Sequence, residues 1–307
     1  MPRVRTVTRA PLLGVTVGVR VAARRRVARA VATAVLAEVA RLEEVCSRFR
    51  PASELERWKR GEVTAPSADL TEVLTLVHRL QTTSGGAYNP CTGVVAERWR
   101  SAAVTGAAPS PAELAGLAAS IAAPRFSLHP VPHPTDDCGP LDLHAAGKGW
   151  IVDRALAAGL AAVDEAPALL VVDAGGDLRH AGTDPVRVGV ADPVDRDQRA
   201  APVATILLRD GAVATSGRTR QGFVVGDARH SHVLDPRTGY PVDHLASVTV
   251  VAPTAAIADG LATVLGVAPV DRVPALADEH GVACLVVDRT GGQHANAAWR
   301  ACTVTTG

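Results

Sequence analysis

Two oxygen-bearing side chains lie four residues apart in an apolar, alanine-rich stretch late in the sequence. Asp259 and Thr263 fall within Thr254–Val267, where apolar residues recur at helical spacing. Residues four apart on a helix share one face. A carboxylate and a hydroxyl are hard oxygen donors, which Mg²⁺ accepts together with water and substrate phosphates. The spacing therefore predicts a metal-binding face, with an exposed or helix-capping aspartate as the alternative.

A second candidate is Leu141–Gly149, where polar and glycine residues interrupt an apolar pattern. We expect a short strand at Leu141–Leu143, with Asp142 pointing away from the buried face. A turn at Gly147 would lead into a helix, and Lys148 and the free amides at that N-terminus would favour an anion. A strand–turn–helix with a surface lysine explains the same residues.

A glycine pair follows the apolar run that ends at Asp173. Gly175 and Gly176 would let a planar or phosphate-bearing ligand approach the backbone closely. The same pair is equally typical of an ordinary hairpin turn, so by itself it favours neither interpretation.

A histidine precedes a turn-forming segment in the second half of the chain. Asp235–Gly239 is typical of a turn held by side-chain–backbone hydrogen bonds, and it follows a predicted strand at Ser231–Leu234. His232 on that strand could accept a proton from a hydroxyl nucleophile. A structural histidine with its hydrogen bonds satisfied is the alternative.

Long helices and many short strands with tight turns are expected to position these residues. This mixture favours an α+β fold over alternating parallel βα units. The segment His129–Pro140, with four prolines, is the best internal boundary. Helices are predicted at about 24–49, from Ser53, at 68–81, within 102–123, at 147–162 and at 254–267. A further helix and two closing strands are predicted after residue 267. Strands are predicted at 4–8, 15–21, 141–143, 168–173, 186–190, 203–208, 213–215, 222–225, 231–234 and 246–252.

Composition excludes several classes of protein. The formal net charge is +1 and no basic stripe alternates with aromatic residues, so nucleic acid is not an expected partner. Five separated cysteines, none in a C-x-x-C pair, suggest neither a disulfide framework nor a zinc site. No apolar run approaches the roughly 20 residues that a membrane span needs, and no leader is evident. We expect a cytoplasmic protein without membrane insertion.

Seven short motifs, in order along the chain, resemble those of the FAD:protein FMN transferase family, also called the ApbE family. They are Cys46–Leu55, Ser84–Pro90, Leu141–Gly149, Asp173–Asp177, Ala214–Gly217, His232–Gly239 and Ala258–Thr263. The resemblance implies a single domain over residues 1–307 with a two-lobed, T-fold-like α+β architecture of mixed or antiparallel sheets flanked by helices. It places the N-terminal lobe at about 1–135 and the C-terminal lobe at about 136–307, with FAD bound between them.

The resemblance also implies roles for individual residues. Asp259, Thr263 and the backbone carbonyl of Ala145 would hold Mg²⁺, and His232, Asp259 and Lys148 would be catalytic. The residues expected to contact FAD are Leu13, Phe49, Ala87, Tyr88, Asn89, Asp142, Lys148, Gly175, Gly176, Ser216 and His232.

The implied reaction transfers FMN from FAD to a threonine or serine hydroxyl of an acceptor protein and releases AMP. Two positions depart from the family pattern, because Leu13 stands where methionine is usual and Asn89 where aspartate is common. Two other functions are compatible with the same motifs. One is an FAD pyrophosphatase that releases FMN and AMP, and the other is a non-catalytic FAD-binding protein.

Overall fold

The computed structural model describes residues 3–136, 138–194, 201–217 and 222–304. Its largest feature is an eight-stranded sheet in which every pairing is antiparallel, and this confirms the predicted α+β class. In spatial order its strands are β1 (Val4–Leu12), β2 (Val15–Ala22), β5 (Leu169–Ala174), β6 (Asp177–Ala181), β9 (Gly211–Gly217), β12 (Leu245–Ala252), β13 (Ala283–Asp288) and β14 (Gln293–Ala295).

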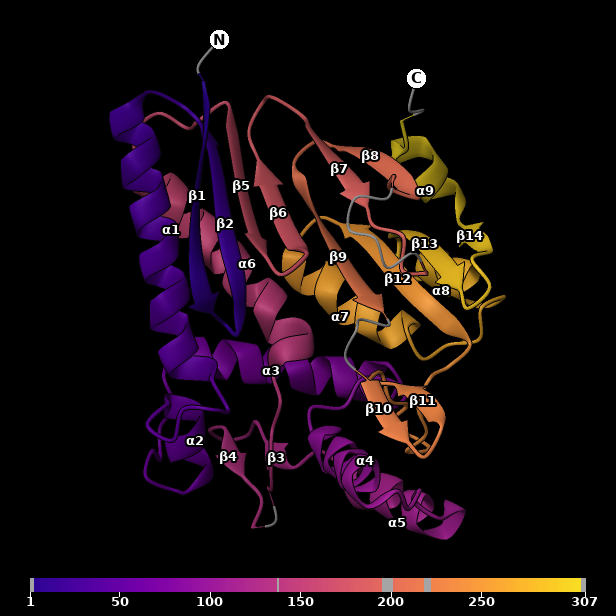
Figure 1. Ribbon diagram of the computed structural model, residues 1–307. Coiled ribbons are helices and arrows are strands. Elements are labelled where there is room, and N and C mark those ends of the chain that lie inside the picture. The colour runs from indigo at the N-terminus through magenta and orange to yellow at the C-terminus, as the bar shows by residue number, and fades with distance from the viewer. Residues whose placement is uncertain (1–2, 137, 195–200, 218–221, 305–307) are drawn as a thin grey trace.

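Long helices cover one face of this sheet (Figure 1). They are α1 (Arg25–Cys46), α6 (His144–Ala161) and α7 (Ala255–Leu265), with the short α8 (Val273–Glu279) beside β13. Part of the opposite face is covered by the hairpin of β7 (Val186–Val190) and β8 (Ala204–Leu208) and by α9 (Ala297–Cys302). Central strands such as β5 are therefore buried on both sides, whereas the edge strand β1 is exposed along most of its length.

Alternation along β5 shows how the two cores are divided. Leu170 and Val172 belong to the core beneath the helices, whereas Leu169 and Val171 belong to the core on the β7–β8 side. Successive side chains of a strand point to opposite faces, so a strand buried on both faces is apolar throughout. This explains the uninterrupted apolar run in the sequence.

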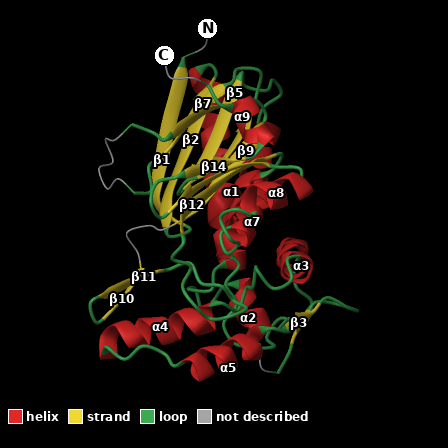
Figure 2. Ribbon diagram, turned by 90° about the vertical axis from the view of Figure 1, so that its right-hand side faces the viewer, coloured by secondary structure: helices red, strands yellow, loops and turns green. Residues whose placement is uncertain are grey.

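A second, smaller layer lies beyond one end of the sheet (Figure 2). It contains α2 (Glu54–Lys59), α3 (Ala68–Thr83), α4 (Gly93–Thr105), α5 (Pro111–Ile121), β3 (Phe126–Ser127), β4 (His133–Pro134), β10 (Gly222–Val225) and β11 (Ala228–Ser231). Within this layer, the helix α3 joins it to the helices on the sheet, since it contacts α1 and α6.

The predicted strand at Leu141–Leu143 is wrong. These residues form no strand, and α6 begins at His144, whose backbone N–H donates to Asp142 Oδ1 at 3.0 Å. A turn is favoured where an aspartate side chain accepts a hydrogen bond from the backbone amide two residues later. Here that preference outweighs the strand preference of an apolar alternation only three residues long. Gly147 therefore lies inside the helix instead of in a turn before it.

Other predicted elements also need correction. The predicted strand Ser231–Leu234 overlaps β11 only at Ser231, so His232 lies in the loop that follows. Five observed elements, α4, β3, β4, β6 and α9, were not predicted. The large sheet takes β1 and β2 from before the predicted boundary and its other strands from after it, so the two chain segments share one sheet.

Candidate active site

The three predicted metal ligands lie together where α6 crosses α7. Asp259 and Thr263 are on α7, and Thr263 Oγ1 donates to the carbonyl oxygen of Ala145 on α6 at 3.3 Å. Asp259 is only 7% exposed and accepts a hydrogen bond from Gly149 N at 3.0 Å. A carboxylate, a hydroxyl and a carbonyl oxygen from two packed helices are thus directed to one region.

The Asp259 carboxylate already has a cationic neighbour. Lys148 Nζ lies 3.8 Å from Asp259 Oδ2 and forms an ion pair with the buried carboxylate of Asp177, the first residue of β6. Burial raises the pKa of Asp259, and Lys148 and the Gly149 amide oppose that rise. Lys148 therefore bridges two acidic groups, and Asp177 joins the predicted site residues.

Two features fix the relative position of the helices. Gly149 packs so closely against Ala255 that a Cβ atom there would overlap the Ala255 carbonyl. Asp153, one turn further along α6, accepts hydrogen bonds from the backbone amides of Ala255 and Ala256, both at 2.9 Å. Amides at a helix N-terminus have no hydrogen-bond acceptor within the helix, so the Asp153 carboxylate serves as their acceptor. The face of α7 that carries Asp259 and Thr263 is therefore held by packing and by a cap from the neighbouring helix.

A second polar cluster lies at the start of α6. Asp142 forms an ion pair with Arg48 Nε at 3.0 Å and accepts from His144 Nδ1 at 3.0 Å. Burial raises the pKa of Asp142, but the His144 hydrogen bond and the Arg48 charge outweigh it and leave the pKa below its usual value. Phe49 is 69% exposed, with the Arg48 guanidinium 4.2 Å from its ring centroid. An exposed aromatic face beside these charges suits a planar heterocycle.

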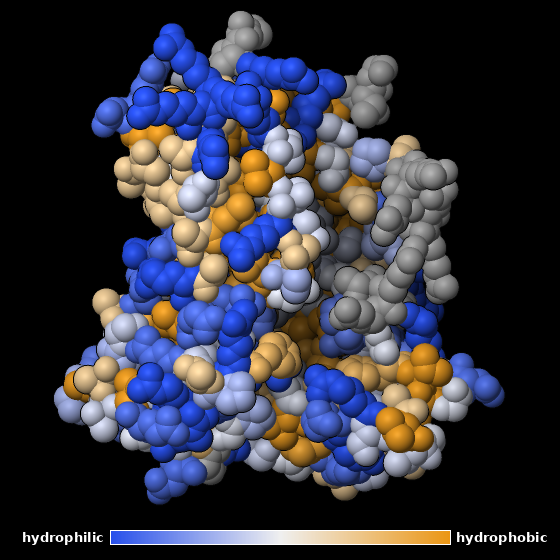
Figure 3. Space-filling view, turned by 60° about the vertical axis from the view of Figure 1, so that its left-hand side comes forward, coloured by the Kyte–Doolittle hydropathy of each residue, from blue (hydrophilic) through white to orange (hydrophobic). Residues whose placement is uncertain are grey.

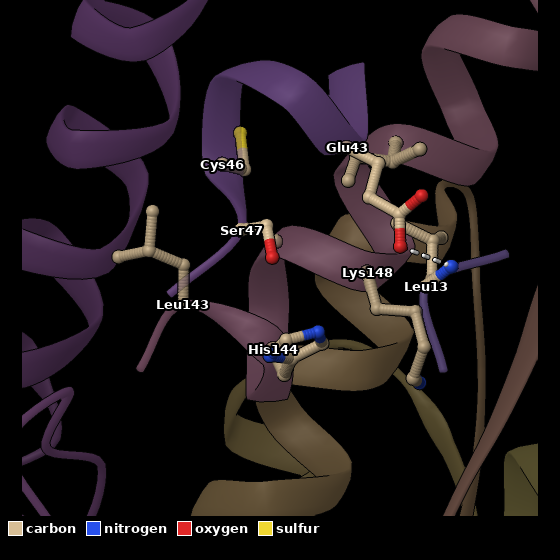
Figure 4. A pocket seen from close by; sticks show the side chains of 9 residues that line it. Leu13, Glu43, Cys46, Ser47, Leu143, His144 and Lys148 are labelled. Atoms are coloured by element: carbon tan, nitrogen blue, oxygen red, sulfur yellow. Dashed lines mark hydrogen bonds between the residues drawn. The ribbon is translucent and has the colours of Figure 1, made fainter. Parts of the chain in front are cut away.

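A small pocket lies between the polar cluster and Lys148. Figure 4 shows Leu13, Glu43, His144 and Lys148 around it. Leu13 has a φ of 53°, in the left-handed region, and its backbone N–H donates to Glu43 Oε1 at 2.9 Å. Leu13 and Lys148, both predicted to contact FAD, are therefore brought to the same pocket.

The Ala87–Asn89 segment lies beneath these groups. Tyr88 is 1% exposed, and its hydroxyl has no hydrogen-bond partner among the residues that the structure describes. Burial, followed by the nearby Asp142 and Asp259 charges, raises the pKa of Tyr88 well above its usual value. The Asn89 amide instead donates to Ile121 O at 2.6 Å and accepts from Cys91 N at 2.8 Å. Its side chain shapes a turn, and its contact with FAD stays a prediction.

The remaining predicted residues occupy other turns and strand ends. Gly175 and Gly176 have φ values of 65° and 101° and form the turn between β5 and β6. Ser216, near the end of β9, lines a small cavity with Ser231. His232, the next residue along the chain, is half-buried. Direct contact of these residues with FAD stays a prediction.

Three polar residues of the site were not chosen from the sequence. Arg48, His144 and Asp177 each lie inside a quoted motif, but only the fold brings them against Asp142 or Lys148. Within the described ranges no cluster of three or more His, Cys, Asp or Glu side chains could hold a metal ion. A metal here would need hydroxyl, carbonyl, water or phosphate oxygens beside Asp259.

A model of the ApbE family matches residues 13–286, a range that includes every site residue named above. The chain belongs to the ApbE family. The family assignment inferred from the motifs is therefore confirmed.

Known ApbE proteins are similar to this chain over most of its length. The FAD:protein FMN transferase of Haemophilus influenzae is 31% identical over 260 residues, which cover 80% of this chain and 74% of that protein. The protein of the same name from Vibrio cholerae is 30% identical over 273 residues, covering 81% and 77%. The ApbE crystal structure from Thermotoga maritima matches with a TM-score of 0.86 at 25% identity and covers 99% of this chain and 100% of that one.

Proposed function

We propose that this ApbE-family chain transfers FMN from FAD to a threonine or serine hydroxyl of an acceptor protein and releases AMP. The meeting of Asp259, Thr263 and the Ala145 carbonyl next to Lys148 supports this proposal. Relatives named FAD:protein FMN transferase that match about four-fifths of the chain support it further. In this reaction the acceptor oxygen forms a bond to the FMN-side phosphorus and the bond to AMP breaks.

The residues present fit a magnesium ion. Mg²⁺ takes few protein ligands and completes its shell with water and phosphate oxygens, as one carboxylate, one hydroxyl and one carbonyl would allow. We propose that Asp259, Thr263 and Ala145 hold it. When bound, the ion would withdraw charge from the pyrophosphate and stabilise the charge that develops on the leaving phosphate.

The chain's own side chains would bind and orient the dinucleotide. Lys148 would place positive charge at the phosphates, exchanging part of its contact with Asp177 for the ligand. Phe49 offers an exposed ring against which a planar base can stack, and Arg48 and Asp142 offer charged hydrogen-bonding groups beside it. We propose that His232 accepts the proton of the acceptor hydroxyl.

The test incubates purified protein with FAD and Mg²⁺, with and without a flavin-acceptor domain, and identifies products by mass spectrometry. We expect an acceptor heavier by one FMN, release of AMP, and loss of both on chelation. FMN and AMP with unmodified acceptor would favour the pyrophosphatase. Bound but unchanged FAD would favour the non-catalytic binding protein.

Variants separate the proposed roles. We expect Asp259→Asn and Thr263→Val to lower the transfer rate about 100-fold or more, because metal-ion catalysis contributes several kcal/mol. The exposed Asp271 provides a matched control, since Asp271→Asn removes the same charge outside the proposed site and should leave the rate unchanged. A His232→Ala variant that binds FAD and keeps the full transfer rate would contradict the role given to His232.

A further inference from the structure

A groove outside the proposed FAD site lies between the edge strand β1 and the first half of α1. Its volume is about 450 Å³, and three arginines, Arg5, Arg25 and Arg29, are among its lining residues. No acidic residue is among the described residues that line it. A concave surface with charge of one sign attracts ligands of the opposite sign.

The strand and the helix place these arginines on opposite walls. Arg5 pairs with Val21 of β2, and directly opposed residues of antiparallel strands point to the same face of the sheet. Val21 belongs to the core beneath the helices, so Arg5 points to the side that α1 covers. Arg25 and Arg29 are four residues apart on α1 and share one face. The groove therefore has an apolar floor, which includes the buried Val21 and Ala32, between positively charged walls.

The charge of the three guanidinium groups is not neutralised within the fold. All three side chains are exposed, and none forms an ion pair within the ranges that the structure describes. Glu38 is the first acidic residue of the chain, and it already pairs with Arg41 at 2.7 Å. Eight arginines precede it although the net charge of the whole chain is only +1, so positive charge is concentrated in this segment.

Fold stability explains only part of this charge. Arginines on an edge strand discourage pairing with another sheet, which accounts for Arg5. At the start of α1, however, positive side chains oppose the positive end of the helix dipole. Arg24 occupies the N-cap position without a side-chain hydrogen bond, and the first turn has no acidic residue. An anionic partner would offset the unfavourable charge of Arg24, Arg25 and Arg26.

Apolar groups beside the arginines indicate the kind of anion. Val4 and Val7, on the same strand as Arg5, are 50% and 40% exposed. Figure 3 shows hydrophilic side chains gathered at this end of the molecule with apolar surface beside them. An anionic lipid combines a phosphate, which a guanidinium binds in a bidentate manner, with an apolar layer that valines can reach. A nucleic acid has no such layer, and no aromatic residue for base stacking is among the described lining residues.

We propose that this arginine face, formed by Arg5, Arg25 and Arg29 with the neighbouring Arg24 and Arg26, docks the protein on the surface of a membrane rich in anionic lipids. The guanidinium groups bind lipid phosphates, and the valines of β1 contact the boundary between head groups and acyl chains. The contact is peripheral and needs no segment that crosses the bilayer. It does not depend on the proposed function, because none of these residues lines the pocket at Lys148.

Vesicle flotation tests the arginine face with the full chain. The vesicles contain phosphatidylcholine alone, or phosphatidylcholine and phosphatidylglycerol in equal parts. We expect binding to the anionic vesicles only, and weaker binding as the salt concentration rises. Changing Arg5, Arg25 and Arg29 together to glutamine should weaken this binding about 100-fold. Changing the same three residues to lysine keeps the charge and should retain binding.

Arg79→Gln, Arg272→Gln and Arg289→Gln together form the matched control. They remove the same charge from exposed positions outside the groove, so this variant should bind vesicles like the wild type. Every variant should melt at the wild-type temperature or above it, because only exposed side chains change. Equal vesicle binding by the two glutamine variants, or binding to neutral vesicles, would overturn the proposal. Tighter binding to duplex DNA or to polyglutamate than to the anionic vesicles would also overturn it, and would assign the face to a nucleic acid or to an acidic protein.

Discussion

At the scale of single residues, the site is organised around Lys148 and two buried carboxylates. Lys148 pairs with Asp177 and lies 3.8 Å from Asp259, so one positive charge faces two negative ones. Buried charges are stable only when they are paired. This imbalance leaves room for an additional cation, which agrees with the proposed magnesium site.

Two buried thiols give a prediction at this scale. Burial raises the pKa of Cys46 and of Cys284 from 9.0 to about 12. Between these values the folded thiols keep protons that the unfolded chain loses, so the free energy of unfolding falls as the pH rises from 9 towards 12. The slope is about 1.4 kcal/mol per pH unit for each thiol. Well below pH 9 the thiols keep their protons in both the folded and the unfolded state, so neither contributes to the pH dependence.

Chemical denaturation at pH 8 to 10.5 measures this slope. A Cys284→Ala variant starts from a lower stability, because a buried side chain is truncated, but its stability should fall less steeply above pH 9 than that of the wild type. Parallel curves for the two proteins would show that Cys284 keeps an ordinary pKa in the fold.

At the scale of elements, the crossing of α6 and α7 determines the geometry of the site. Gly149 lets the two helices touch, and Asp153 caps α7 from the side of α6. The same crossing brings the Ala145 carbonyl to Thr263. The backbone contact, the cap and the positions of the proposed metal ligands therefore depend on the same helix crossing.

Gly149→Ala should destabilise the protein by about 2 kcal/mol or more, because the new methyl group has no room and forces the helices apart. It should also weaken the Gly149–Asp259 hydrogen bond and lower the transfer rate. Gly116→Ala is the matched control, since a Cβ there meets nothing within 4 Å on the surface of α5. That control should be stabilising by about 0.5–1 kcal/mol. Equal unfolding free energies for the two variants would contradict the close-packing argument.

At the scale of the whole molecule, the N-terminal segment is part of the main sheet. β2 pairs with β5, and α1 packs against α6, so residues on both sides of the predicted boundary share the sheet and the helical layer that covers it.

In the described part of the chain no helix is long and apolar enough to cross a membrane. The first 37 residues contain eight arginines and no acidic residue. Figure 3 shows hydrophilic side chains gathered at the end of the molecule near the N-terminus.

The shared sheet predicts that the two segments do not fold separately. A fragment of residues 1–135 leaves β2 without its partner β5 and α1 without α6, so it should lack a cooperative urea transition. The whole chain should unfold in one transition. Circular dichroism of the fragment and of the chain compares the two, and a cooperative transition in the fragment alone would show that the N-terminal lobe is autonomous.

The sequence by itself determined most local elements, the family and the motifs from which the site is built. Helical and alternating periodicity depend on neighbouring residues, so α1, α3, α7 and most strands could be predicted. The start of α6 could not, because Asp142 both accepts from the amide of His144 and binds Arg48, nearly a hundred residues earlier. Only the tertiary structure decided that Lys148 meets Asp177 and that the Ala145 carbonyl meets Thr263. Such pairings join segments that are far apart in the chain, and their free energy comes from packing that no local pattern records.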